Sequence, residues 1–124
     1  MPLWDGVPYE YAAVTGHLVF TAGACPLDET GRVVAPGDLE AQAEQAVANL
    51  LEALAERGVG SAGIAKTTVY VVAGERSDLV RMVGGRLGTA RPRAEHALGV
   101  SLLGYPDQLV EIEAVAAAPR SDAG

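Results

Sequence analysis

The sequence predicts an α+β fold in which one mixed sheet of five or six strands is covered on one face by two helices. Three observations lead to this expectation: alternating apolar and acidic residues at 109–117, a long amphipathic segment at 38–57, and the segment order β-β-(β)-α-β-α-β-β. Two helices are too few to cover both faces of such a sheet. We therefore expect an open face of mixed polarity that contacts further subunits.

The N-terminal part predicts a β-hairpin followed by a short strand. Apolar segments at 9–14 and 17–22 flank Thr15-Gly16, and a two-residue link that contains glycine is typical of a hairpin. A further short strand is expected at 32–35, before a Pro-Gly pair.

The clearest helix is expected to begin at the N-cap Asp38 and to end just before Gly58. Its apolar residues recur at helical spacing and predict one buried face, formed by Leu39, Ala43, Ala46, Val47, Leu50, Leu51 and Leu54.

The second half predicts a β-branched strand at 64–72, a short helix capped by Ser77, and strands at 97–103 and from Leu109 onward. In the last strand Val110, Ile112 and Ala114 share one face, whereas Glu111 and Glu113 share the other. Carboxylates are seldom buried without a partner. The polar face therefore borders water, an interface or a site.

Composition narrows the classes of function. Nine basic and sixteen acidic residues among 124 give a net charge of −7 (9 − 16), which opposes nucleic-acid binding. Three arginines at 86–93 form a local exception that could hold an anion, but such clusters are more often solvated loops. No apolar run is long enough to span a membrane. We expect one domain over 1–124, with loose termini at 1–7 and 118–124.

The sequence offers few other candidates for catalytic or metal-binding residues. The single cysteine, Cys25, and an N-terminus without signal-peptide features indicate a cytoplasmic protein. Cys25 could be a nucleophile only beside a base, so a buried, inert thiol is the preferred interpretation. His96 could act as a general base, although an ordinary surface histidine is preferred. Metal-ligand spacings and nucleotide fingerprints are absent from the sequence, and we expect neither metal nor cofactor.

Several segments in order resemble the Rid (YjgF) family. They are Pro8-Tyr9, Leu-Val-Phe-Thr-Ala-Gly at 18–23 with Pro26, Gly31, Val33-Val34, the helix from Asp38 through Asn49-Leu50, Lys-Thr-Thr-Val-Tyr at 66–70 and Leu-Val-Glu-Ile-Glu-Ala-Val-Ala at 109–116. The resemblance implies a chorismate-mutase-like fold and a homotrimer with a central barrel. It also implies three small-molecule clefts between subunits, where deaminating members hydrolyse imines or enamines.

The resemblance carries over two site residues directly. Glu111 matches the glutamate that positions or activates water, and Tyr9 matches a tyrosine that lines the cleft. The family's substrate-binding arginine falls on Glu95, or on Arg93 if a small insertion is allowed.

Two further positions of the family's pocket also differ. Ala22 replaces a serine, and Val83 lies roughly where the family has an asparagine. The chain therefore resembles an arginine-lacking Rid subgroup.

The exchange of an arginine for Glu95 would repel a substrate carboxylate. Glu95 beside Glu111 would form an acid–base pair suited to a neutral or cationic substrate. We therefore expect a hydrolase or tautomerase acting on an imine other than that of a standard amino acid. The alternative is a trimeric binder without catalysis, and RNA cleavage is the least favoured function.

Overall fold

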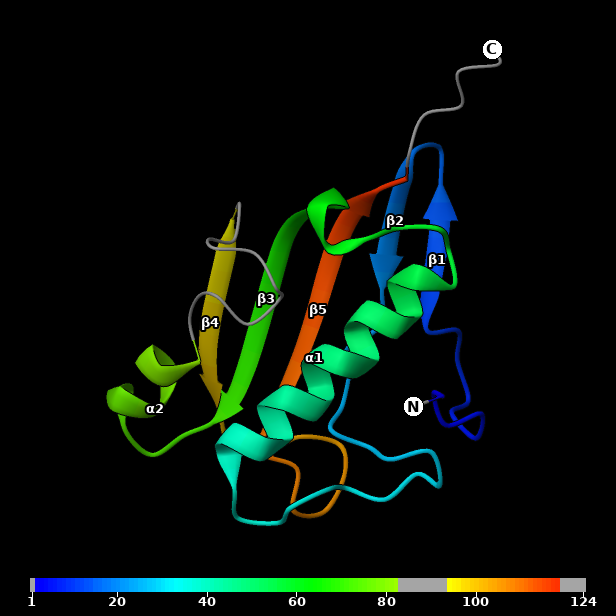
Figure 1. Ribbon diagram of the computed structural model, residues 1–124. Coiled ribbons are helices and arrows are strands. Elements are labelled where there is room, and N and C mark those ends of the chain that lie inside the picture. Colours follow the sequence, from blue (N-terminus) through cyan, green and yellow to red (C-terminus); the bar gives the residue numbers. More distant parts are fainter. Residues whose placement is uncertain (1, 83–93, 119–124) are drawn as a thin grey trace.

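The computed structural model describes residues 2–82 and 94–118, which form a five-stranded mixed sheet with two helices (Figure 1). The strand order is β1-β2-β5-β3-β4, and only β3 and β4 pair in parallel. The strands are β1 (Ala12–Thr15), β2 (Leu18–Thr21), β3 (Ile64–Val72), β4 (Glu95–Val100) and β5 (Val110–Ala117). The helices are α1 (Leu39–Ala55) and α2 (Arg76–Arg81), and a 3-10 turn, η1 (Ser61–Gly63), precedes β3. The α+β prediction is confirmed.

The N-terminal hairpin forms one residue later than its sequence indicates. Thr15 pairs with Leu18, so the turn consists of Gly16, with φ +59°, and His17. The prediction of a strand at 32–35 is wrong, because the structure forms only an isolated bridge between Leu27 and Val33 there. Ala35 has φ +42°, and this left-handed conformation ends the extended backbone.

Helix α1 begins where its cap predicts. The Asp38 carboxylate accepts a hydrogen bond from the Ala41 backbone N–H at 3.0 Å, which satisfies one of the free donors of the first turn. The helix ends at Ala55, and Gly58 follows with φ +75°. Its apolar side buries Leu50 and Leu54 completely against the sheet. Burial of a leucine side chain contributes about 1.5–3 kcal/mol, so this face holds α1 in place.

Elements of the second half differ from prediction at their ends. Strand β3 has the predicted bounds, but α2 starts at Arg76 after Glu75, and Ser77 is not its cap. Strand β4 begins at Glu95 and ends at Val100, because its parallel pairing with β3 ends at Val72. The strand predicted at 97–103 is therefore displaced toward the N-terminus.

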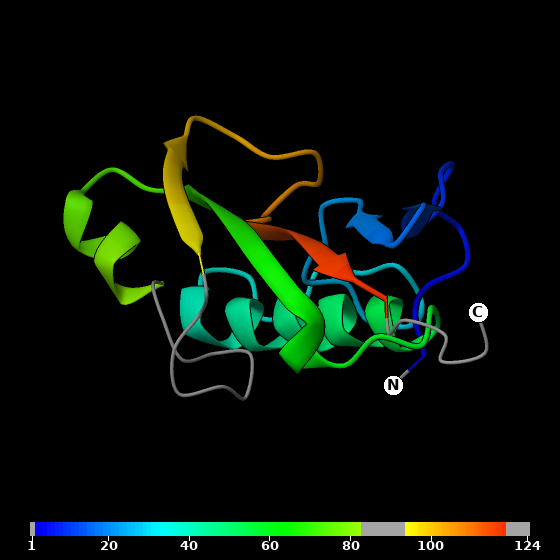
Figure 2. The same ribbon diagram turned by 90° about the horizontal axis from the view of Figure 1, so that it is seen from above.

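The two faces of the sheet differ as predicted. Figure 2 shows α1 along one side of the sheet and α2 beyond the β4 edge. Met82, just after α2, joins the same buried core as α1. Along β5, burial alternates with a period of two, and the glutamates lie on the uncovered face. None of the described helices is long and apolar enough to cross a membrane.

Candidate functional site

Glu111 lies on the open face of β5, opposite the segment that follows β2. Ala24 bridges Ile112, with hydrogen bonds of 2.6 and 3.1 Å between their backbones. In an antiparallel pair this register sets Cys25 across from Glu111. Because Ala24 and Ile112 both point into the core, Cys25 and Glu111 share the other face.

The two oxygens of Glu111 have different surroundings. Oε1 accepts hydrogen bonds from the Cys25 thiol at 3.3 Å and from the Gln108 amide at 3.4 Å. Among the residues that the structure describes, none donates to Oε2. This oxygen lies over Gly23, where an added Cβ would be only 2.2 Å away. Glycine at position 23 is thus what gives the carboxylate its space.

Helix α1 holds the two loops beside Glu111, which contain residues 25–27 and 107–109. The buried Asn49 amide donates to the carbonyl oxygens of Cys25 and Leu27, each at 2.9 Å. The fully buried Gln42 donates to the Asp107 carbonyl at 3.0 Å and accepts from the Leu109 N–H at 2.8 Å. These contacts supply hydrogen-bond partners to backbone groups of the loops. The position of Glu111 therefore depends on two buried amides of α1.

Tyrosines gather at the same end of the open face. Tyr9 and Tyr11 pack edge to face, with ring centroids 6.4 Å apart. The pKa of Tyr9 is raised to about 12, chiefly by burial and also by the charges of Cys25, Tyr105, Tyr11 and Glu111. Tyr9 is 45% exposed, so its ring is available to a ligand beside Glu111. Tyr105 is a member of this cluster that the sequence did not identify.

Cys25 is a neutral thiol at physiological pH. Its pKa is raised to about 12, chiefly by burial and also by the negative charge of Glu111 and the hydrogen bond to it. A thiolate, not a thiol, is the nucleophile. The prediction of a buried thiol is confirmed, and its raised pKa supports the interpretation that it is inert.

Glu113, two residues further on, has a separate set of contacts. The Tyr70 hydroxyl donates to its Oε1 at 2.6 Å, and this bond raises the Tyr70 pKa, as do burial and the two nearby glutamates. Glu113 and Lys66 both line a hollow of about 180 Å³ on the open face. Glu113 is thus a hydrogen-bonded neighbour of the candidate site.

Three other predicted site residues, Ala22, Val83 and Arg93, make no described contact with Glu111. Ala22 adjoins Gly23, and its N–H donates to the Tyr11 carbonyl at 2.9 Å. Val83 and Arg93 lie outside the described residues.

Glu95 does not face Glu111 within one subunit, so a single chain does not form the expected acid–base pair. Glu95 pairs with Thr67, and Glu111 pairs with Tyr70. Thr67 and Tyr70 are an odd number of positions apart on β3, so they point to opposite faces. Glu95 is therefore on the helix-covered face of the sheet, and Glu111 is on the open face.

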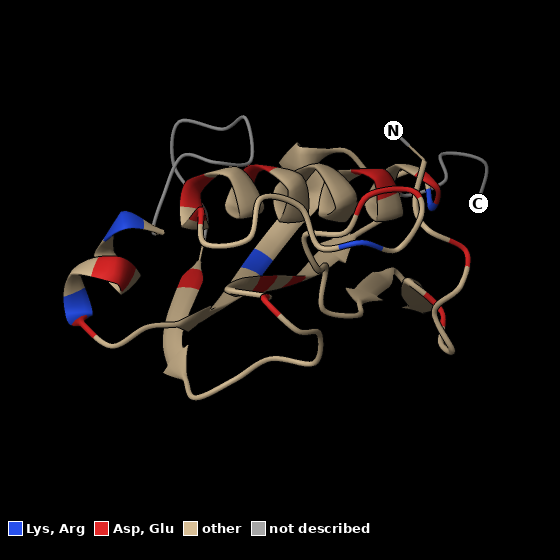
Figure 3. Cartoon of the chain, turned by 90° about the horizontal axis from the view of Figure 1, so that it is seen from below, with Lys and Arg blue, Asp and Glu red and all other residues tan. Residues whose placement is uncertain are grey.

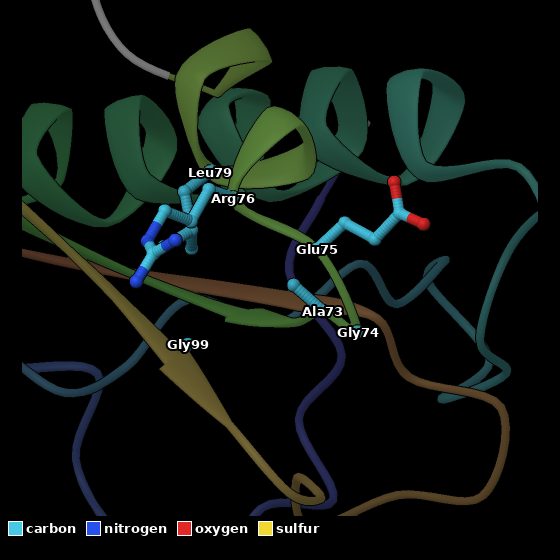
Figure 4. A pocket seen from close by; sticks show the side chains of 6 residues that line it. All are labelled: Ala73, Gly74, Glu75, Arg76, Leu79 and Gly99. Atoms are coloured by element: carbon cyan, nitrogen blue, oxygen red, sulfur yellow. The ribbon is translucent and has the colours of Figure 1, made fainter.

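A larger hollow of about 580 Å³ lies away from Glu111, where β3 leads into α2 (Figure 4). Its lining is formed by Ala73, Gly74, Glu75, Arg76, Leu79 and Gly99. Figure 4 shows the side chains of Glu75 and Arg76 directed away from each other. Of the predicted site residues that the structure describes, none lines this hollow.

The charged residues and possible metal ligands of the described part of the chain further characterise the candidate site. Figure 3 shows acidic segments along α1 and on the sheet, with basic segments scattered over α2, β3 and the loops. Within residues 2–82 and 94–118, no group of three or more His, Cys, Asp or Glu gathers as metal ligands would. The candidate site is thus a carboxylate with neutral hydrogen-bond donors and tyrosines.

A half-covered five-stranded sheet with a glutamate on its open face, beside an N-terminal tyrosine, defines a protein of the YjgF type. The sequence profile of the family described as endoribonuclease L-PSP matches residues 6–118. The chain belongs to this family, which is also called Rid, YjgF or RutC.

Relatives and solved structures agree with this assignment. A RutC family protein of Pyrococcus abyssi is 34% identical over 113 residues, covering 88% of this chain and 85% of the relative. A RutC family protein of Synechocystis is 34% identical over 114 residues, covering 90% and 87%. Among solved structures, a Rid family protein of unknown function, YyfA from Yersinia pestis, has a TM-score of 0.77 at 30% identity, covering 90% of this chain and 88% of that one. A putative endoribonuclease of Thermotoga maritima has a TM-score of 0.74 at 29% identity, covering 95% and 92%.

Proposed function

We propose that this Rid family protein hydrolyses a small reactive imine or enamine, with Glu111 as the general base. The observation that carries the proposal is the asymmetric environment of the Glu111 carboxylate. Oε1 accepts hydrogen bonds from Cys25 and Gln108, while Oε2 has no donor among the described residues and can receive a proton. A carboxylate within hydrogen-bond reach of a water molecule can take its proton as the oxygen attacks carbon.

The reaction needs no cofactor. Water loses one proton to Oε2 while its oxygen bonds to the imine carbon, and the π electron pair moves to nitrogen, which takes up a proton from solvent. Glu111 then returns its proton to the nitrogen of the resulting carbinolamine. The C–N bond breaks to release ammonia, and the hydroxyl proton leaves to solvent as the carbonyl forms. The overall change adds one water to the imine and yields one ketone or aldehyde and one ammonia.

We further propose a homotrimer in which the cleft around Glu111 is completed by a neighbouring subunit. The open face of the sheet exposes Leu18, Phe20 and Leu98 by 42%, 43% and 37%. Apolar side chains of this size on one uncovered face favour association with a second surface. Size-exclusion chromatography with light scattering tests the trimer, and a monomer would contradict this part of the proposal.

The substrate is proposed to be neutral or cationic. Glu111 and its tyrosine neighbours present negative or neutral groups, and within residues 2–82 and 94–118 no lysine or arginine is among the charges that perturb Tyr9 or Cys25. A substrate carboxylate would therefore meet Glu111 without compensation from these residues. Val83 and Arg93, together with Ala22 and Glu95, are the further positions at which substitution would test substrate choice.

The test is to generate imines in situ with amino-acid and amine oxidases and to follow the release of ammonia. Wild-type protein should accelerate release from a neutral or cationic imine, and Glu111→Gln should abolish the acceleration. Glu113→Gln is the matched control, because it alters the neighbouring glutamate on the same face. If no acidic, neutral or basic imine is hydrolysed faster than in buffer, the protein is a binder without this activity.

A further inference from the structure

A buried thiol and a buried amide converge on one oxygen of the proposed general base. The Cys25 Sγ and the Gln108 Nε2 both donate to Glu111 Oε1, at 3.3 and 3.4 Å. Gln108 is itself fixed, since its amide also donates to the Val110 carbonyl at 3.0 Å and its oxygen accepts from the Tyr105 N–H at 3.2 Å. Cys25 is fixed through its own carbonyl, which Asn49 holds. The donors are therefore rigid parts of the fold.

This arrangement breaks the symmetry of the carboxylate. A free glutamate side chain can rotate and exchange its two oxygens, because its terminal torsion is soft. Here two fixed donors select Oε1, and the absence of a side chain on Gly23 gives Oε2 its place. The side chains of Cys25 and Gln108 thus contact the oxygen of the carboxylate that lies away from Gly23.

We propose that Cys25 and Gln108 are positioning residues that anchor Oε1 of Glu111 and so direct Oε2 toward the attacking water. This inference rests on the proposed hydrolase function. Misplacement of a catalytic group by about 1 Å costs on the order of a hundredfold in rate, which is the scale on which such anchoring acts.

The anchoring contact can be measured without any activity assay. Cys25 is the single cysteine of the chain, so its S–H stretching band in a Raman spectrum reports one thiol. The S–H band of a thiol lies at lower frequency the stronger its hydrogen bond is. In Glu111→Ala the thiol keeps only the Gly23 carbonyl, at 3.5 Å, as an acceptor, so the band should move to higher frequency. In the matched control Glu113→Ala it should stay in place. A band that is the same in all three proteins would overturn the contact.

The effect on catalysis is tested with three substitutions of Cys25. Cys25→Val keeps the packing but loses the donor, and it should lower kcat about tenfold with little change in KM. Cys25→Ala should do the same, whereas Cys25→Ser, which keeps a donor, should recover most of the wild-type kcat. Gln108→Met removes the second donor to Glu111 Oε1 and so tests the same role.

A role in packing alone predicts the reverse order, with Cys25→Val active and Cys25→Ser impaired, and this result would overturn the inference. The two proposals fail in different ways. Wild-type protein without imine hydrolysis would refute the proposed function, and the S–H band would then decide alone whether Glu111 is anchored. Normal hydrolysis that is equally fast in Cys25→Val would refute the positioning role only.

Discussion

The Cys25 thiol donates a hydrogen bond to Glu111 Oε1 over 3.3 Å, although 86 residues separate them in the chain. The contact forms because Ala24 bridges Ile112 and thereby sets their neighbours face to face. It joins the loop after β2 to the centre of β5. The candidate site is consequently a product of tertiary pairing, and changes in the supporting residues should alter it in measurable ways.

Gly23→Ala should disturb Glu111 directly. A Cβ at position 23 would lie 2.2 Å from Oε2, so the carboxylate has to move. We expect imine hydrolysis to fall by about 10- to 100-fold, as for a misplaced catalytic group, while the chain remains folded. Hydrolysis rates and thermal unfolding measure the two effects.

Gly74→Ala is the matched control for this change, because nothing lies within 4 Å of an added Cβ there. It should leave hydrolysis as in wild type. Full activity of Gly23→Ala would show that Oε2 is not the reacting oxygen.

Asn49→Leu should destabilise the protein. The substitution keeps the approximate volume but removes both bonds to the carbonyl oxygens of Cys25 and Leu27. The Cys25 carbonyl keeps the Leu27 N–H as a donor at 2.8 Å, whereas the Leu27 carbonyl loses its donor. One buried acceptor without a donor should lower the free energy of unfolding by about 1–3 kcal/mol, measured by urea denaturation. Glu44→Ala, on the exposed side of α1, should stay within about 0.5 kcal/mol of wild type. A loss as small as that of the control would mean that water satisfies the Leu27 carbonyl.

Thr67→Val should stabilise the protein. Thr67 is 1% exposed, and its hydroxyl has no hydrogen-bond partner among the described residues. Replacing this hydroxyl by a methyl group removes the cost of an unpaired polar group and should raise the free energy of unfolding by about 1 kcal/mol. Thr68→Val, on the opposite face, is the control with little expected change. A destabilised Thr67→Val would reveal an undetected partner for the hydroxyl.

The stability of the fold should fall at alkaline pH because of Cys25. Its pKa is about 12 in the folded protein and 9.0 for an unperturbed thiol, so above pH 9 the unfolded chain releases this proton more readily than the folded one. The folded state then binds more protons, and the free energy of unfolding decreases as pH rises through the interval between the two values.

Urea denaturation at pH values from about 8 to 10 tests this decrease, before tyrosine ionisation in the unfolded chain dominates. Tyr9, Tyr11 and Tyr70 have raised pKa values, and they contribute in the same direction at higher pH. Cys25→Ala should show a flatter dependence than wild type. Parallel curves for the two proteins would rule out the thiol as the cause.

Periodic elements were predictable because their signals are local. Strand β3 has the predicted bounds, Asp38 caps α1, and burial alternates along β5 as its glutamates indicate. The strand expected at 32–35 failed, because local β propensity does not provide a pairing partner.

The site was only partly predictable. Glu111 and Tyr9 follow from the family resemblance, and the structure brings them together. The face of Glu95 depends on the parallel register of β3 and β4, and the contact of Cys25 with Glu111 depends on a bridge between distant segments. Neither pairing leaves a signal in the neighbouring residues, so the face of Glu95 within one subunit could not be predicted and the thiol donor was missed.

The position of β5 at the middle of the sheet has a consequence for biosynthesis. Its neighbours β2 and β3 are made earlier, but they do not pair with each other. Until β5 leaves the ribosome, the nascent chain can form only the β1–β2 hairpin and the β3–β4 pair, which are two separate fragments. The contacts that join them are long-range, and such contacts form slowly. Completion of the sheet, and with it the placement of Glu111, must therefore wait until β5 has been synthesised.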